Sequence, residues 1–168
     1  MSLKKKVNQN RAIIVVGRTE TEKMAKAMSF VSENPIVQYA NEYNIEHAVV
    51  NNISEASKIH SFFRTILVLQ DIPKKEISEN IIITINSLRS IEKIAFGTKV
   101  EIKIDTGMHR NGILPSELDD TLNKIIDRGL VLNGVFTHFS SAYYDDLTIY
   151  DQKKLFDELK SEILFDKR

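Results

Sequence analysis

Residues 100–113 read Val100-Glu-Ile-Lys-Ile-Asp-Thr-Gly-Met-His-Arg-Asn-Gly-Ile113 and form the most informative part of the chain. The first half alternates apolar and charged residues with the period of a β-strand, so Glu101, Lys103 and Asp105 share one face. Charged side chains on a buried strand are costly unless they point into a polar, liganded interior. The alternative is an edge strand whose charged face lies in solvent, and composition alone does not separate the two.

Similar runs recur along the chain. Short, continuously apolar and mostly β-branched segments are typical of parallel strands covered on both faces. They lie at residues 12–16, 48–50, 66–69, 81–85, 100–104 and 134–139. Between them, apolar residues at helical spacing predict helices at 19–32, 35–43, 54–59, 87–95, 116–126 and 150–164. Ser54 is the expected N-cap of the helix at 54–59, and Gly129 the expected stop after 116–126. The face expected to be buried in helix 116–126 is Leu118, Leu122, Ile125 and Ile126.

This alternation of strands and helices predicts a parallel α/β fold with about six βα units. A doubly wound sheet fits that number, and so does three-quarters of an eight-stranded TIM-type (β/α)8 barrel, which typically needs about 250 residues. In both folds the functional residues lie at the C-terminal ends of the strands and in the loops that follow. Periodicity leaves both folds open.

A second segment, Gly134-Val-Phe-Thr-His-Phe-Ser-Ser-Ala142, leads a strand directly into His138 and a loop rich in hydroxyl groups. A single histidine at a strand end is more often a structural residue than a catalytic one. Its occurrence beside the segment at 100–113 favours the functional interpretation.

Together, residues 103–113 and 134–142 resemble the paired barrel motifs of alanine racemases, fold-type III enzymes that use pyridoxal 5'-phosphate (PLP). Weaker support comes from residues 44–50, followed by Ser54-Glu-Ala56, and from Ile66-Leu-Val-Leu69, which resemble the second and third strands of that family. The resemblance extends from about Ile36 to Leu164 and implies a partial TIM-type barrel. It also implies the interconversion of L- and D-alanine for cell-wall precursor supply.

The resemblance assigns roles to individual residues. Arg110 matches the arginine that bonds the phenolic oxygen of the cofactor and helps to hold the substrate carboxylate. Lys103 matches a lysine that is carbamylated in some members and there braces that arginine. His138 matches a histidine near the cofactor ring, and Leu69 matches a cofactor-pocket position. A guanidinium offers fixed donors to phenolate and carboxylate oxygens, and a histidine can polarise a ring substituent.

Asp105 and Thr106 fit the turn of the same motif and have a supporting part by resemblance. Residues 1–35 match the family poorly, so we expect a divergent first βα unit there and a barrel segment over residues 36–168.

The sequence also departs from the family pattern. The family has its cofactor-binding lysine at the end of the first strand, and the nearest candidate is Lys26, within a helix-like stretch. Arg18 follows the first apolar run and cannot form the same covalent link. Tyr143 stands where relatives have Asp. The last two barrel strands and the C-terminal β-domain, which supplies the second catalytic base across a dimer interface, are expected to be absent. We therefore expect a barrel segment that is inactive alone.

Two other interpretations remain open at this stage. One is a single-domain PLP-binding protein of the same superfamily. The other is a non-catalytic barrel remnant that pairs with another chain, as a homo-oligomer or through open sheet edges.

Composition excludes several classes of protein. Lys+Arg and Asp+Glu both total 23, so the formal net charge is zero and no long-range field attracts nucleic acid or an anionic membrane. The absence of cysteine excludes disulfides and thiolate chemistry, and a cytoplasmic location is expected. No apolar run approaches the roughly 20 residues needed to span a bilayer. The four histidines show no ligand spacing that predicts a metal site.

Overall fold

The computed structural model describes residues 13–15, 35–73, 75–140 and 147–165. They form two compact units, of which the first contains Ile77–Ile82 and the chain up to Asp71. The second contains Ile72–Glu76 and the chain from Ile83 onward. Each unit is built on parallel strands that pair in the order of the sequence.

The first unit contains three parallel strands, β1 (Ile13–Val15), β2 (His47–Val50) and β3 (Thr65–Val68). Its helices are α2 (Pro35–Glu42) and α3 (Ile53–Ile59), and a 3-10 turn, η3 (His60–Phe62), follows α3. The strand runs predicted at 12–16, 48–50 and 66–69 are confirmed to within about two residues at each end.

The helix predicted at 54–59 is confirmed, but its expected cap is wrong. Asn52, not Ser54, is the N-cap of α3, and its Oδ1 accepts a hydrogen bond from the Glu55 N–H at 2.9 Å. The Glu55 carboxylate in turn accepts from the Asn52 amide and from the Asn51 N–H, both at 2.9 Å. This reciprocal arrangement satisfies orphan N–H groups at the helix start, and it places the cap two residues earlier than predicted.

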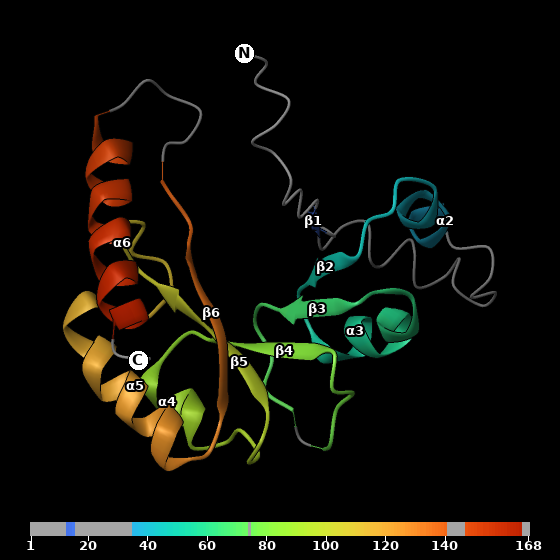
Figure 1. The fold of residues 1–168 in the computed structure, drawn as a ribbon, viewed down its shortest axis with the longest axis horizontal. Helices are drawn as coiled ribbons and strands as arrows, with labels where there is room; N and C mark the ends of the chain where they lie inside the picture. The colour runs from blue at the N-terminus through green and yellow to red at the C-terminus, as the bar shows by residue number, and fades with distance from the viewer. Residues whose placement is uncertain (1–12, 16–34, 74, 141–146, 166–168) are drawn as a thin grey trace. The chain divides into compact units, whose positions relative to one another are not determined.

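The second unit contains β4 (Ile81–Ile85), which begins in the first unit, together with β5 (Lys99–Ile104) and β6 (Val131–Thr137). Its helices are α4 (Leu88–Ile91), α5 (Leu118–Asp127, after the 3-10 turn η4, Pro115–Glu117) and α6 (Thr148–Phe165). Figure 1 shows α4, α5 and α6 gathered on one side of β6, and α5 packs against both α4 and β6. Val100, Ile102 and Ile104 are fully buried in the core of this unit.

Two helices of this unit differ from the prediction in detail. The α-helical part of α4 ends at Ile91 instead of residue 95, because i→i+3 bonds from the Lys93 and Ile94 N–H groups tighten the chain into turns. On α5, Ile126 is 72% exposed, whereas Thr121 is fully buried and donates its hydroxyl to the Glu117 carbonyl at 2.7 Å. Ile125 fills the inward position, so its neighbour points away from the core. Gly129 ends the helix as predicted, with φ +60°.

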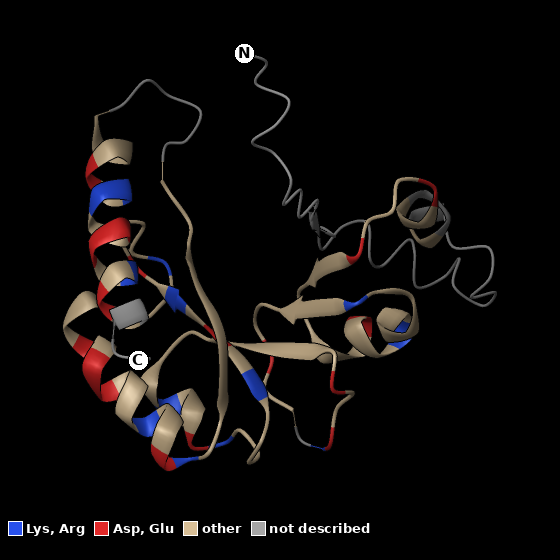
Figure 2. Cartoon of the chain, viewed as in Figure 1, with Lys and Arg blue, Asp and Glu red and all other residues tan. Residues whose placement is uncertain are grey.

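Figure 2 shows charges of both signs on α5 and on α6. In the part of the chain that the structure describes, no helix is long and apolar enough to cross a bilayer.

Candidate functional site

The charged face of β5 is not on an edge strand. β5 is hydrogen-bonded to β4 on one side and to β6 on the other, so the alternative of a solvated edge strand is wrong. Lys103 and Asp105 are only 8% and 9% exposed, on the face opposite the apolar core residues. The sheet therefore carries buried charge at the C-terminal end of β5, as the functional interpretation requires.

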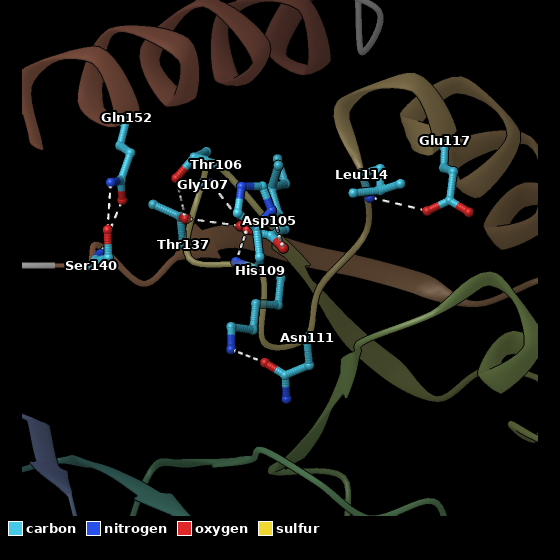
Figure 3. A network of polar contacts seen from close by, with 12 residues as sticks. Asp105, Thr106, Gly107, His109, Asn111, Leu114, Glu117, Thr137, Ser140 and Gln152 are labelled. Atoms are coloured by element: carbon cyan, nitrogen blue, oxygen red, sulfur yellow. Dashed lines mark hydrogen bonds and ion pairs between the residues drawn. The ribbon is translucent and has the colours of Figure 1, made fainter. Parts of the chain in front are cut away.

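Asp105 organises the loop that follows β5. Its Oδ1 accepts hydrogen bonds from the backbone N–H groups of Gly107 and His109, both at 3.0 Å, and its Oδ2 lies 3.7 Å from His109 Nδ1 (Figure 3). Burial by itself would raise the pKa of the Asp105 carboxyl. Hydrogen bonds from the backbone of Gly107, His109 and Met108, with the nearby His109 ring, outweigh burial and hold that pKa below its ordinary value. Asp105 is therefore an ionised anchor for the loop.

The same loop returns to the strand it left. The Asp105 N–H donates to the Ile113 carbonyl at 2.9 Å, and the Ile113 N–H donates to the Lys103 carbonyl at 2.8 Å. Gly112 permits this closure, because a Cβ at that position would lie 2.9 Å from the Asp105 backbone nitrogen, and its φ is +133°. The loop is thus fixed at both ends, with Arg110 between them.

Lys103, near the end of β5, and Arg110, on this loop, form a cationic pair. The Lys103 amine donates a hydrogen bond to Oδ1 of Asn111, the residue next to Arg110. Burial and the Arg110 guanidinium lower the pKa of the Lys103 amine, and Asp105 offsets part of that effect. The Arg110 side chain is exposed and has no hydrogen-bond partner among the described residues. Its donors are therefore available to a ligand.

The end of β6 is joined to the end of β5 through two threonines. Thr137 Oγ1 donates to the Ile104 carbonyl at 2.8 Å and lies 2.8 Å from Thr106 Oγ1. Because the Thr137 proton is used on the carbonyl, the Thr106 hydroxyl is the donor in the second bond. The pair holds His138, the next residue after β6, beside the arginine loop. Loss of hydration and the positive charges of Arg110 and Lys103 lower the pKa of His138.

The structure thus brings together five of the predicted site residues in the second unit: Lys103, Asp105, Thr106, Arg110 and His138. Leu69 belongs to the first unit, where it follows β3 and its N–H donates to the Val50 carbonyl at 2.9 Å. Lys26, Arg18 and Tyr143 lie outside the described residues. No group of three metal-ligating side chains occurs among residues 13–15, 35–73, 75–140 and 147–165.

Three residues of the site were not predicted: Asn111, Thr137 and Gln152. Gln152 lies on α6 and is only 6% exposed. It shares a helix face with the buried Leu159 and Ile163, so a polar residue at an apolar position was the available signal. Asn111 and Thr137 gave no comparable signal, since their roles depend on partners brought close by folding.

The comparisons with known proteins agree on one family. The family model for the alanine racemase N-terminal domain matches residues 4–166. The chain belongs to the alanine racemase family. The alanine racemase of Campylobacter curvus is 37% identical over 129 residues, which are 77% of this chain and 38% of that protein. The alanine racemase of Nitratiruptor sp. is 38% identical over 120 residues, 71% of this chain and 35% of that protein.

Solved alanine racemases share the fold. The enzyme from Bacillus anthracis, solved with bound L-Ala-P, has a TM-score of 0.64 at 26% identity and covers 76% of this chain and 37% of its own. The enzyme from Oenococcus oeni has a TM-score of 0.60 at 27% identity, with 74% and 37% covered. The predicted partial TIM-type barrel is confirmed, and the doubly wound sheet is excluded. The chain spans little more than a third of the length of these alanine racemases, a family of PLP-dependent enzymes.

Proposed function

We propose that this chain forms the cofactor-facing part of the barrel domain of a PLP-dependent alanine racemase. The observation that carries the proposal is the convergence of Lys103, Arg110 and His138 at the C-terminal ends of β5 and β6, within residues that match the family. In a barrel of this type, that end is where ligands bind.

The donor set of the site suits PLP, which carries anionic phenolate and phosphate oxygens. Arg110 presents an exposed guanidinium with no described protein partner, and it lies close enough to the Lys103 amine to lower the pKa of that amine. Asp105, the carboxylate of the same loop, is already engaged by two backbone N–H groups. The positive charge is therefore available to a bound anion.

Each residue has a proposed part in this function. Arg110 would hold the phenolic oxygen and orient the substrate carboxylate with its fork of N–H donors. His138 has a lowered pKa, so near neutral pH its ring is neutral and can donate or accept one hydrogen bond beside the cofactor ring without adding positive charge. Lys103 would brace the loop of Arg110 through Asn111, and Asp105 and Thr106 would fix the turn.

By the positions that they match in the family, Lys26 is proposed as the lysine that binds PLP covalently, and Leu69 as a cofactor-binding residue. Bound PLP would supply an electron sink that acidifies the Cα–H of the amino acid.

The partners and location proposed for the protein follow from the family. The substrate is alanine, with D-alanine as product, and the assembly is a homo-oligomer in the cytoplasm. Because the matched residues make up about 38% of the relative from Campylobacter curvus, we expect the 168 residues alone to bind PLP without racemising alanine.

The proposal is tested by titrating the chain with PLP and recording absorbance, then reducing with borohydride and mapping the labelled peptide. We expect a new absorbance band and a label on Lys26. A label on Lys103 would show that PLP binds covalently to this buried amine instead of to Lys26. A chain that gives no band would keep the family scaffold without its cofactor, and the proposed function would be rejected.

A matched pair of variants links the result to the site. Arg110→Gln should weaken PLP binding about 10-fold or more, because a charged hydrogen bond contributes about 1.5–3 kcal/mol. Arg89→Gln makes the same change at an exposed position of α4 and should bind PLP like the wild type. Equal affinities of the two variants would remove Arg110 from the site.

A further inference from the structure

Gln152 is a buried polar side chain on the first turns of α6. Both ends of its amide are used by Ser140: Oε1 accepts from the Ser140 N–H at 3.0 Å, and Nε2 donates to Ser140 Oγ at 2.7 Å (Figure 3). Because a buried amide without partners is costly, this pair of bonds fixes Ser140 and Gln152 relative to each other.

The same side chain also lies beside the loop of Arg110. A Cβ added to Gly107 would lie 3.2 Å from Gln152 Cγ and 3.4 Å from Cδ, so the absence of a side chain at Gly107 makes room for the glutamine. One residue of α6 is therefore bonded to the loop after β6 and lies against the loop after β5.

His138 lies between two fixed points in this arrangement. On its N-terminal side, Thr137 is bound to the Ile104 carbonyl and to Thr106. On its C-terminal side, two residues further on, Ser140 is bound to Gln152. Only Phe139 intervenes, so loss of the second fixed point would leave the histidine held from one side.

We propose that Gln152 is a positioning residue that holds the loop of His138 against the loop of Arg110. The inference that this positioning serves cofactor binding rests on the proposed function, because both loops belong to the proposed PLP site. The side chain acts through Ser140 and Gly107.

The test is the ring titration of His138 by NMR in the 168-residue chain, in the wild type and in Gln152→Leu. Leucine has a similar size and removes both hydrogen bonds to Ser140. Once the loop is released, the imidazole regains water and lies farther from Arg110 and Lys103, so the pKa of His138 should rise toward its ordinary value. An unchanged pKa in a folded Q152L would overturn the proposal.

Two further variants complete the design. Leu159→Ala shortens another buried side chain of α6 without touching Ser140, so it should lower stability and leave the His138 titration unchanged. If the pKa of His138 shifts equally in L159A, the effect of Gln152 is one of packing alone and the proposal is overturned. Ser140→Ala keeps the backbone bond and removes the hydroxyl bond, so it should give an intermediate shift, and it carries the test if Q152L does not fold.

These measurements contain no cofactor. Failure of PLP to bind would reject the proposed function and leave this inference standing. An insensitive His138 would reject the inference and leave the proposed function standing.

Discussion

Asp105→Ala tests how one carboxylate holds the loop of Arg110. The Asp105 side chain is 6% exposed, and its Oδ1 accepts from the N–H groups of Gly107 and His109 at 3.0 Å each. Alanine leaves both donors without an acceptor. The unsatisfied Gly107 N–H costs about 1–3 kcal/mol, and the exposed His109 N–H, which water can reach, loses one net hydrogen bond of about 1 kcal/mol. We therefore expect the free energy of unfolding to fall by about 2–4 kcal/mol.

Asp105→Asn removes the negative charge of the side chain and keeps an oxygen that can accept hydrogen bonds. The amide keeps an oxygen for both N–H groups, so the expected loss is smaller, about 1 kcal/mol. The folded-state pKa of Asp105 lies below its unfolded value, so the contribution of the ionised carboxylate is fully present above about pH 4 and disappears as pH falls through the folded-state pKa. The difference between wild type and D105N should therefore be constant near neutral pH and should shrink only in acid.

The assay is urea unfolding followed by far-ultraviolet circular dichroism, with hydrogen exchange at the Gly107 and His109 amides to locate the loss. Asp127→Ala, at the exposed end of α5, is the control and should change stability little. If D105A and D127A unfold with the same free energy, or if the two amides keep their protection in D105A, the anchoring role of Asp105 is refuted.

Three other predictions use the same unfolding assay. Gly112→Ala should lower the free energy of unfolding more than Gly129→Ala does. The methyl group added at Gly112 meets backbone atoms at 2.9 and 3.1 Å, whereas the one added at Gly129 meets the exposed Phe96 ring, which can move. An equal or reversed order would contradict the closure of the loop at Gly112. Thr137→Val should lower the free energy of unfolding by about 1–2 kcal/mol, because it removes the hydroxyl that bonds to the Ile104 carbonyl and to Thr106. An unchanged free energy of unfolding would count against these two hydrogen bonds. His138 has a lowered folded-state pKa, so the unfolded chain binds its proton first and stability should fall as pH drops from about 7 to about 5. His138→Gln should flatten that part of the curve, and an identical slope in the variant would show that His138 does not titrate as described.

Much of the fold could be predicted from the sequence because each strand carries its own local signal. The β-branched runs gave the strands, and the alternation at 100–105 correctly placed Lys103 and Asp105 opposite the apolar core. The predicted N-cap of α3 was wrong because Ser and Asn both suit that position, and the hydrogen bonds of Glu55 favour Asn52 over Ser54.

The site could be predicted only as far as its motifs. The motifs at residues 103–113 and 134–142 identified the charged side chains of the site. The contacts that join the two loops could not be predicted, because they link residues that are far apart in the sequence. The Thr106–Thr137 bond spans 31 residues, and no local pattern indicates it. Gln152 depends in the same way on the approach of α6 to the two loops, and Asn111 depends on the loop turning back toward Lys103.

The loops after β5 and β6 converge on one cationic site. The most direct measurement is the ring titration of His138 by NMR in the wild type and in Arg110→Gln, with Arg89→Gln as the control. This convergence predicts a pKa of His138 below its ordinary value in the wild type, a rise toward that value in R110Q, and no change in R89Q. A His138 that titrates at its ordinary value of about 6.5 in the wild type and does not respond to R110Q would contradict it.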